Sequence, residues 1–136
     1  MLEVNDGVHS NYFIDRWFSF AKRHIFRCDH RTHNVVAVIL INKRLISVGW
    51  NDTNKSHPEM SQLNCHKKLH AELMAINKVK HKHDLSKAQM VVYAETKAGL
   101  KVLGKPCPYC HELIKRYGIK DVIYSSHEGH GRIKVA

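Results

Sequence analysis

The chain has 136 residues, of which 43% are hydrophobic, so it is long enough to bury the core of one ordinary domain and we do not expect disorder. Its Lys and Arg residues outnumber its Asp and Glu residues by 22 − 12 = 10, which favours phosphate-bearing partners without specifying any chemistry. No apolar run approaches the roughly 20 residues that span a bilayer, and no secretory signal opens the chain, so we expect a single domain over residues 1–136 in the cytoplasm, with no membrane contact.

The first third of the chain predicts a helix followed by a β-hairpin. Between residues 11 and 24, apolar side chains recur at helical spacing and share one face; they are Phe13, Ile14, Trp17, Phe18 and Ala21. Residues 35–41 form an unbroken aliphatic run that is typical of a buried strand. Asn42 and Lys43 then predict a tight turn into a second strand at residues 45–50.

The rest of the chain alternates loops, helices and short strands. Residues 51–68 predict a loop, and the spacing of apolar residues from 69 to about 80 predicts a second helix. Four more elements follow: a strand at 90–93, a helix beginning at Pro106, a strand at 122–124 and, after a glycine turn, a last antiparallel strand at 132–135. Gly118 is expected to end the third helix in the left-handed conformation. This order predicts an α/β fold with a mixed sheet and helices on its faces.

Two short motifs, at residues 70–72 and 106–110, carry residues suited to a metal centre. Cys107 and Cys110 are three residues apart at a predicted helix start, so both sulfurs can reach one ion, and the helix dipole favours their thiolates. His70 begins the other helix and supplies a third ligand, which leaves the fourth tetrahedral position of a zinc ion for water, as in catalytic sites. Glu72 lies close enough to accept a proton from that water.

Other interpretations of these residues remain open. The cysteine pair can serve as a thiol redox pair, although it comes late in the chain for such a motif. A structural zinc site completed by Cys65 or His66 is also possible, but it leaves Glu72 without a role. The cluster of Cys28, His30 and His33 suits either a second metal site or a basic connector.

The pattern H-x-E…P-C-x-x-C resembles that of the zinc-dependent cytidine and deoxycytidylate deaminase superfamily. The resemblance covers about residues 35–125 and rests on four segments: GWN at 49–51, HAELMAI at 70–76, KPCPYC at 105–110 and LIKRYGIKDVIY at 113–124. It implies a cytidine-deaminase-like mixed central sheet of about five strands flanked by helices, a Zn²⁺ cofactor and a homo-oligomer. By analogy, Asn51 holds a sugar hydroxyl, unless it only ends the hairpin, and Ala71 shapes the substrate pocket through its backbone.

The resemblance implies hydrolytic deamination of a cytosine nucleotide or nucleoside, with dCMP converted to dUMP as the leading reaction. Basic residues near Asn51 suggest a place for a 5′ phosphate; they are Lys43, Arg44, Lys55 and His57. Glu72 would take the proton from water, pass it to the ring nitrogen and later protonate the departing amine.

The alternative is a nucleic-acid deaminase acting on single-stranded DNA or tRNA. The net charge and the HAELMAI segment, which is similar to that of tRNA adenosine deaminases, support it. The pair Gly104-Lys105, the few aromatic residues and the dispersal of basic residues over the chain speak against it. A binding domain that kept the zinc without catalysis is a third hypothesis, and an intact Glu72 argues against that one.

Overall fold

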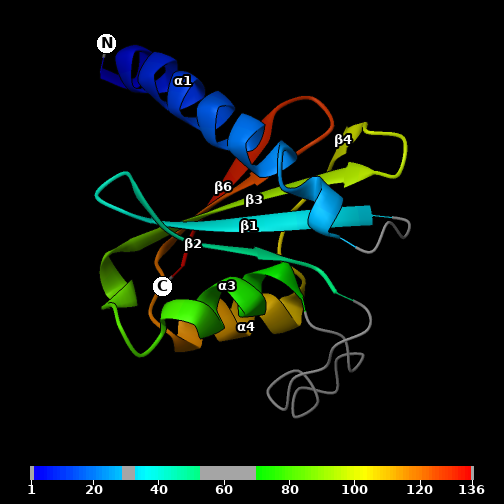
Figure 1. Cartoon of the computed structure of the whole chain (residues 1–136). Helices are drawn as coiled ribbons and strands as arrows, with labels where there is room; N and C mark the ends of the chain where they lie inside the picture. Colours follow the sequence, from blue (N-terminus) through cyan, green and yellow to red (C-terminus); the bar gives the residue numbers. More distant parts are fainter. Residues whose placement is uncertain (1, 29–32, 53–69, 136) are drawn as a thin grey trace.

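The computed structural model describes residues 2–28, 33–52 and 70–135, with side chains from Tyr12 onward. The elements follow in chain order: α1 (Leu2–Lys22), η1 (Ile25–Arg27), β1 (His33–Ile41), β2 (Arg44–Trp50), α3 (Ala71–Val79), η2 (Leu85–Lys87), β3 (Ala88–Thr96), β4 (Lys101–Val102), α4 (Pro108–Arg116), β5 (Asp121–Ser125) and β6 (His130–Lys134) (Figure 1). This order confirms the predicted alternation of helices and strands. Among the described residues, no helix is both long enough and apolar enough to cross a membrane.

The strands form one mixed sheet in the order β2-β1-β3-β5-β6. The pairs β1–β2, β1–β3 and β5–β6 are antiparallel, whereas β3–β5 is parallel. The mixed sheet of about five strands is therefore confirmed, as is the antiparallel last strand. The short strand β4 pairs with β3 beside this path and lies where we expected only a loop, at residues 97–105.

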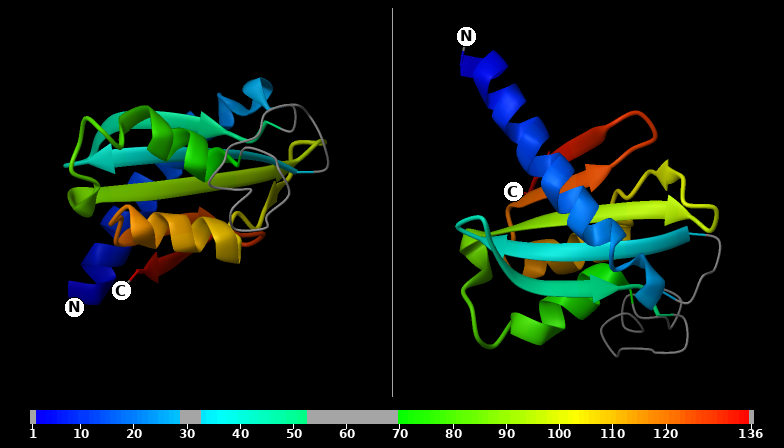
Figure 2. Two further views of the ribbon diagram at one scale, coloured as in Figure 1. Left: turned by 90° about the horizontal axis from the view of Figure 1, so that it is seen from below. Right: turned by 45° about the horizontal axis from the view of Figure 1, so that its top comes forward.

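Helices cover the sheet on both faces, with α1 on one side and α3 and α4 side by side on the other (Figures 1 and 2). Alternate residues of β1 explain why its sequence is apolar throughout. Val36 and Val38 pack against α1, while Ala37 and Ile39 pack in the cluster that α3 and α4 cover, and all four are fully buried.

Backbone geometry confirms the turn residues and corrects two helix starts. Asn42 and Lys43 have φ of 53° and 63°, which matches the twist of a two-residue hairpin turn, and Gly118 ends α4 at φ 88°. The first helix begins at Leu2 and not near Asn11, because regular backbone extends beyond the amphipathic segment on which the prediction rested. The helix α4 begins at Pro108 and not at Pro106, since Cys107 caps it with an extended backbone and proline suits the first helical position.

Candidate active site

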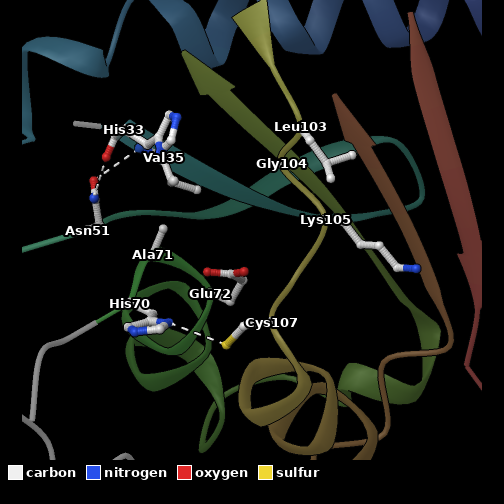
Figure 3. Close-up of a pocket in the computed structure, with 10 residues that line it drawn as sticks. All are labelled: His33, Val35, Asn51, His70, Ala71, Glu72, Leu103, Gly104, Lys105 and Cys107. Atoms are coloured by element: carbon white, nitrogen blue, oxygen red, sulfur yellow. Dashed lines mark hydrogen bonds between the residues drawn. The ribbon is translucent and has the colours of Figure 1, made fainter. Parts of the chain in front are cut away.

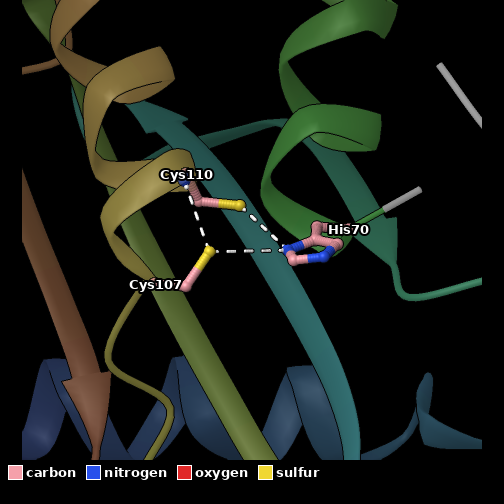
Figure 4. Close-up of side chains that lie close together, drawn as sticks. All are labelled: His70, Cys107 and Cys110. Atoms are coloured by element: carbon pink, nitrogen blue, oxygen red, sulfur yellow. Dashed lines mark hydrogen bonds between the residues drawn. The ribbon is translucent and has the colours of Figure 1, made fainter. Parts of the chain in front are cut away.

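The two helices α3 and α4 begin at the same edge of the sheet and bring three metal-binding side chains together. His70 is the residue that caps α3, Cys107 caps α4, and Cys110 lies in the first turn of α4. His70 Nδ1 lies 3.2 Å from Cys110 Sγ and 3.8 Å from Cys107 Sγ (Figure 4). All three ligand atoms lie within 4.8 Å of one another, in the one such group of three or more that the described residues form.

This donor set fits a zinc ion in geometry and in chemistry. Bonds of about 2.05 Å to nitrogen and 2.3 Å to sulfur at tetrahedral angles separate N and S by about 3.6 Å, a value between the two measured separations. The pKa of Cys107 falls to about 4, chiefly through its hydrogen bonding with Cys110, which outweighs burial, and with help from His70. The thiolate that zinc requires is therefore favoured, and the predicted zinc cofactor is confirmed for the site that His70, Cys107 and Cys110 form.

Glu72 lies in the first turn of α3 and is buried, with only 6% of its surface exposed. Burial raises the pKa of this carboxyl group, while the neighbouring His70 works in the opposite direction. In Figure 3 the carboxyl group points away from the helix, above Cys107 and beside Ala71. A carboxyl group in this position can accept a proton and return it during a reaction.

A pocket of about 270 Å³ opens over these side chains (Figure 3). Its walls come from the start of β1, the end of β2, the start of α3 and the segment before the cysteines; the lining residues are His33, Val35, Asn51, His70, Ala71, Glu72, Leu103, Gly104, Lys105 and Cys107. The pocket therefore contains the two residues we expected to bind substrate, Asn51 and Ala71, beside Glu72.

The wall at residues 103–105 is fixed by a buried serine. Ser125 Oγ donates to the Val102 carbonyl (2.7 Å) and accepts from the Ala94 amide (3.0 Å), and the Gly104 amide donates to the Ser125 carbonyl (2.8 Å). A Cβ atom on Gly104 would lie 2.9 Å from Ser125 Oγ, so only glycine fits at this close approach. These bonds hold the segment that leads into Cys107.

Asn51 ties the two strand ends at the pocket together. Its side-chain oxygen accepts from the Val35 amide (3.0 Å), and its side-chain nitrogen donates to the His33 carbonyl (3.0 Å). An asparagine side chain has two N–H donors and two acceptor sites on its oxygen. These two bonds use one donor and one acceptor site. The residue thus ends the hairpin, as one interpretation held, and also lines the pocket.

Two of the four basic residues expected near Asn51, Lys43 and Arg44, lie elsewhere. Arg44 pairs with Ile41 beside the hairpin turn, whereas Trp50 pairs with Val36 at the other end of the strand. At about 3.3 Å per residue along the strand, Arg44 and Lys43 are about 23 and about 26 Å from Asn51, so the prediction that they flank the pocket is wrong. Lys55 and His57 lie outside the described residues.

Among the described residues, the basic side chains that line the pocket, apart from the metal ligand His70, are those of His33 and Lys105. Lys105 stands two residues before Cys107, so its place follows from the motif. The position of His33 depends on the pairing of β1 with β2 and β3, which no local pattern reveals.

The second candidate metal cluster is not assembled by the described residues. Cys28 is buried, with 3% of its surface exposed, and its thiol donates to the Val35 carbonyl (3.5 Å). His33 lines the catalytic pocket, and His30 lies outside the described residues.

Comparisons with known proteins give a family and a fold. The model of the family described as the cytidine and deoxycytidylate deaminase zinc-binding region matches residues 9–126. No curated protein sequence matches the chain. A cytidine deaminase from Burkholderia pseudomallei has a similar structure, with a TM-score of 0.62 at 14% identity over 87% of this chain and 89% of its own.

Two further solved structures share the architecture. A dCMP deaminase from the cyanophage S-TIM5 gives a TM-score of 0.56 at 21% identity, over 82% of this chain and 80% of its own. A diaminohydroxyphosphoribosylaminopyrimidine deaminase/5-amino-6-(5-phosphoribosylamino)uracil reductase from Thermotoga maritima gives 0.56 at 24% identity, over 85% of this chain and 30% of its own. At these identities the likenesses establish the fold, which is the cytidine-deaminase-like fold that the sequence predicted.

Proposed function

The chain belongs to the cytidine and deoxycytidylate deaminase family, and from this premise we propose that it hydrolyses the amino group of deoxycytidylate, converting dCMP to dUMP. As a member of this family the protein is a zinc-dependent deaminase that acts on cytosine compounds. The observation that carries the proposal is the buried Glu72 beside three convergent zinc donors at the base of a small pocket. We also propose that residues 1–136 form one catalytic domain, that it works in the cytoplasm and that it assembles with copies of itself.

In the proposed mechanism Glu72 moves the protons. His70, Cys107 and Cys110 would hold the zinc ion, which supplies Lewis-acid activation of the hydrolytic water. Glu72 accepts a proton from this water as its oxygen adds to C4 of cytosine, and it delivers that proton to N3. It then takes the proton of the new C4 hydroxyl and passes it to the exocyclic amine, the C4–N bond breaks, and ammonia leaves as the C4 carbonyl forms.

Two further pocket residues are proposed to position the substrate. The second N–H donor and the second acceptor site of the Asn51 side chain suit a sugar hydroxyl. The bonds of Asn51 to His33 and Val35 keep this side chain in place. Ala71 is 1% exposed and lines the pocket between Asn51 and Glu72, where its small side chain leaves room for the base. Neither residue is assigned a role in proton transfer.

Pocket size and charge favour a free nucleotide over a polymer. A pocket of about 270 Å³ is near the lower end of small-molecule sites, which begin at about 300 Å³. Lys105 supplies positive charge for a phosphate and His33 a ring nitrogen that can hydrogen-bond to it, and in Figure 3 the Lys105 side chain extends away from Glu72. In a nucleotide, the 5′ phosphate is likewise far from the amino group that reacts. The cyanophage S-TIM5 enzyme has been solved in complex with dCMP and dUMP, which supports the same substrate class.

The experiment that tests this function compares free nucleotides, free nucleosides and polymers. Purified protein is incubated with cytidine, deoxycytidine, CMP, dCMP, a single-stranded oligonucleotide and tRNA, and the products are identified by mass. We expect dCMP to be the best substrate. Deamination within the oligonucleotide or tRNA, with none of the free compounds turned over, would establish the alternative function, a nucleic-acid deaminase.

A change at Lys105 tests the proposed phosphate contact. Lys105→Gln should lower kcat/KM for dCMP by about tenfold or more, the effect of losing one charge-assisted hydrogen bond, and leave deoxycytidine turnover unchanged. Lys87→Gln is the matched control. Lys87 is exposed and comes just before the first residue of β3, at the end of this strand that lies away from the pocket. Equal losses on dCMP and deoxycytidine would show that Lys105 supports the pocket and does not bind a phosphate.

A further inference from the structure

A second cavity, a groove of about 600 Å³, runs along β2 outside the catalytic pocket. One wall comes from the segment at the end of α1 and from η1, the other from the end of α3 and the residues that follow it. Five of its lining side chains are basic, namely His24, Arg27, Lys78, Lys82 and His83, and none of the lining residues in the described part of the chain is acidic. We call this cavity the basic groove.

The two cations at one end of the basic groove are held in place by Trp50. The guanidinium of Arg27 lies 5.0 Å from the Trp50 ring centroid, and the ammonium of Lys78 lies 4.3 Å from it. Lys78 also donates a hydrogen bond to the Val48 carbonyl. Because these long side chains are already ordered, an anionic ligand would lose less side-chain entropy on binding them than on binding mobile surface lysines.

The basic groove and the catalytic pocket are lined by consecutive residues at the end of β2. Trp50 lines the groove, and the next residue, Asn51, lines the pocket. From Trp50 the groove follows β2 back to Leu45, and a strand of seven residues spans about 20 Å. This length offers room for several phosphates in a row and not only for one.

We propose that the basic groove binds the sugar–phosphate backbone of a single-stranded nucleic acid. Cations on both walls suit successive phosphates, and the apolar side chains of β2 on the floor, Leu45, Ile46 and Val48, suit the faces of unpaired bases. Binding in the basic groove does not depend on the proposed dCMP turnover. The groove lies outside the pocket and contains none of the residues assigned to catalysis or to substrate binding.

A second copy of the chain is a less suitable occupant. The strand β2 is at the end of the described sheet and could pair edge to edge with a copy of itself. Such two-fold pairing would bring the cations of one groove against those of the other, and among the described lining residues no carboxylate offsets this repulsion. A polyanion meets the same charges with attraction.

The test measures binding of a short fluorescein-labelled oligothymidine to the full chain by anisotropy, from about 50 to 200 mM salt. The groove variant is Arg27→Gln/Lys78→Gln/Lys82→Gln, and the control Lys87→Gln/Lys97→Gln/Lys120→Gln removes equal charge from exposed lysines outside the groove. Each phosphate contact of a single strand contributes about −0.7 to the slope of log Kobs against log salt. With about three contacts, we expect a wild-type slope of about −2 or steeper. The groove variant should bring this slope close to zero, while the control variant leaves it nearly unchanged.

A second variant guards against a folding defect in the first. Lys82 is exposed, so Lys82→Glu changes the charge of the groove without disturbing Trp50, and it should weaken oligothymidine binding at least tenfold at the lowest salt while melting at the wild-type temperature. Equal effects of the groove and control variants, a duplex bound as tightly as the single strand, or a dimer that the groove variant dissociates would each overturn the proposal. The last result would assign the groove to a second copy. Turnover of dCMP, measured in parallel, reports separately on the catalytic pocket.

Discussion

Single residues at helix starts determine the metal centre. His70 and Cys107 both occupy capping positions, where the backbone is still extended and the side chain projects from the end of the helix. Sequence motifs describe this local geometry well, so the three ligands and Glu72 were identifiable from their spacing. The hydrogen bonds of Asn51 with His33 and Val35 could not be predicted from spacing, because they join residues from the two ends of a hairpin. Lys43 and Arg44 were misplaced although the predicted hairpin turn already puts them at the end of the strand away from Asn51.

A different residue, Asp121, governs how stability should depend on pH. Burial works to raise the pKa of Asp121, but hydrogen bonds from Arg132 Nε (2.8 Å) and Nη2 (2.7 Å) outweigh it, so this pKa lies below its usual value. A carboxylate with a lowered pKa stabilises the fold above its unfolded pKa, near 4, and this contribution is lost as the pH falls through the folded pKa.

Asp121→Asn should therefore lower the free energy of unfolding by about 1 kcal/mol at pH 7, the value for a well-formed surface pair. Urea unfolding should show this difference shrinking as the pH falls below about 4. Glu128→Gln is the control, since Glu128 is an exposed carboxylate in the turn between β5 and β6. A difference between wild type and Asp121→Asn that stays constant with pH would contradict the assignment.

Elements, in turn, are positioned by close contacts that a sequence pattern shows only in part. The unbroken aliphatic run at residues 35–41 predicted β1, and the turn residues Asn42 and Lys43 predicted the hairpin that leads into β2. The contact of α3 with β2 depends on Gly49, where a Cβ atom would lie 2.2 Å from the Ala71 carbonyl oxygen and 2.5 Å from the Ala75 amide nitrogen. The short strand β4 was missed because two residues are too few to show a period.

Gly49→Ala should push the start of α3, which carries His70 and Glu72, away from the sheet. Overpacking of this kind costs about 1–3 kcal/mol, so the melting temperature should fall together with dCMP turnover and zinc content. Gly129→Ala serves as the control, because a Cβ atom there meets no other atom within 4 Å. A Gly49→Ala protein that melts and turns over dCMP like wild type would show that the contact does not position the helix.

At the scale of the whole molecule, the fold brings together residues that lie far apart in the chain. The sequence predicted the fold class, since strand and helix order and the deaminase motifs agree. It did not predict the basic groove, because Arg27 and Lys78 come from separate elements and meet only through Trp50. Dispersal of basic residues along a chain is therefore a poor guide to their dispersal on the surface.

Assembly is a further property of the whole molecule. We predict a homo-oligomer. Leu113 and Ile114 do not contribute to its interface, because each is 1% exposed and belongs to the core. Leu100 and Leu103 are better candidates for the interface, being 67% and 54% exposed beside the pocket. Light scattering should give a mass of at least twice the 15.7 kDa chain, and Leu100→Ser/Leu103→Ser should lower it. A monomer mass at every concentration would refute this prediction.

The most direct test of the account measures zinc content and dCMP turnover on the same protein samples. Wild type and Glu72→Gln should each hold about one zinc ion per chain, while Cys107→Ala/Cys110→Ala should hold little, because two of the three ligands are gone. Only wild type should release ammonia from dCMP at full rate, and Glu72→Gln should lose a factor of about 10² to 10⁴ or more. Full zinc content in the double cysteine variant, or near-normal turnover by Glu72→Gln, would contradict the account.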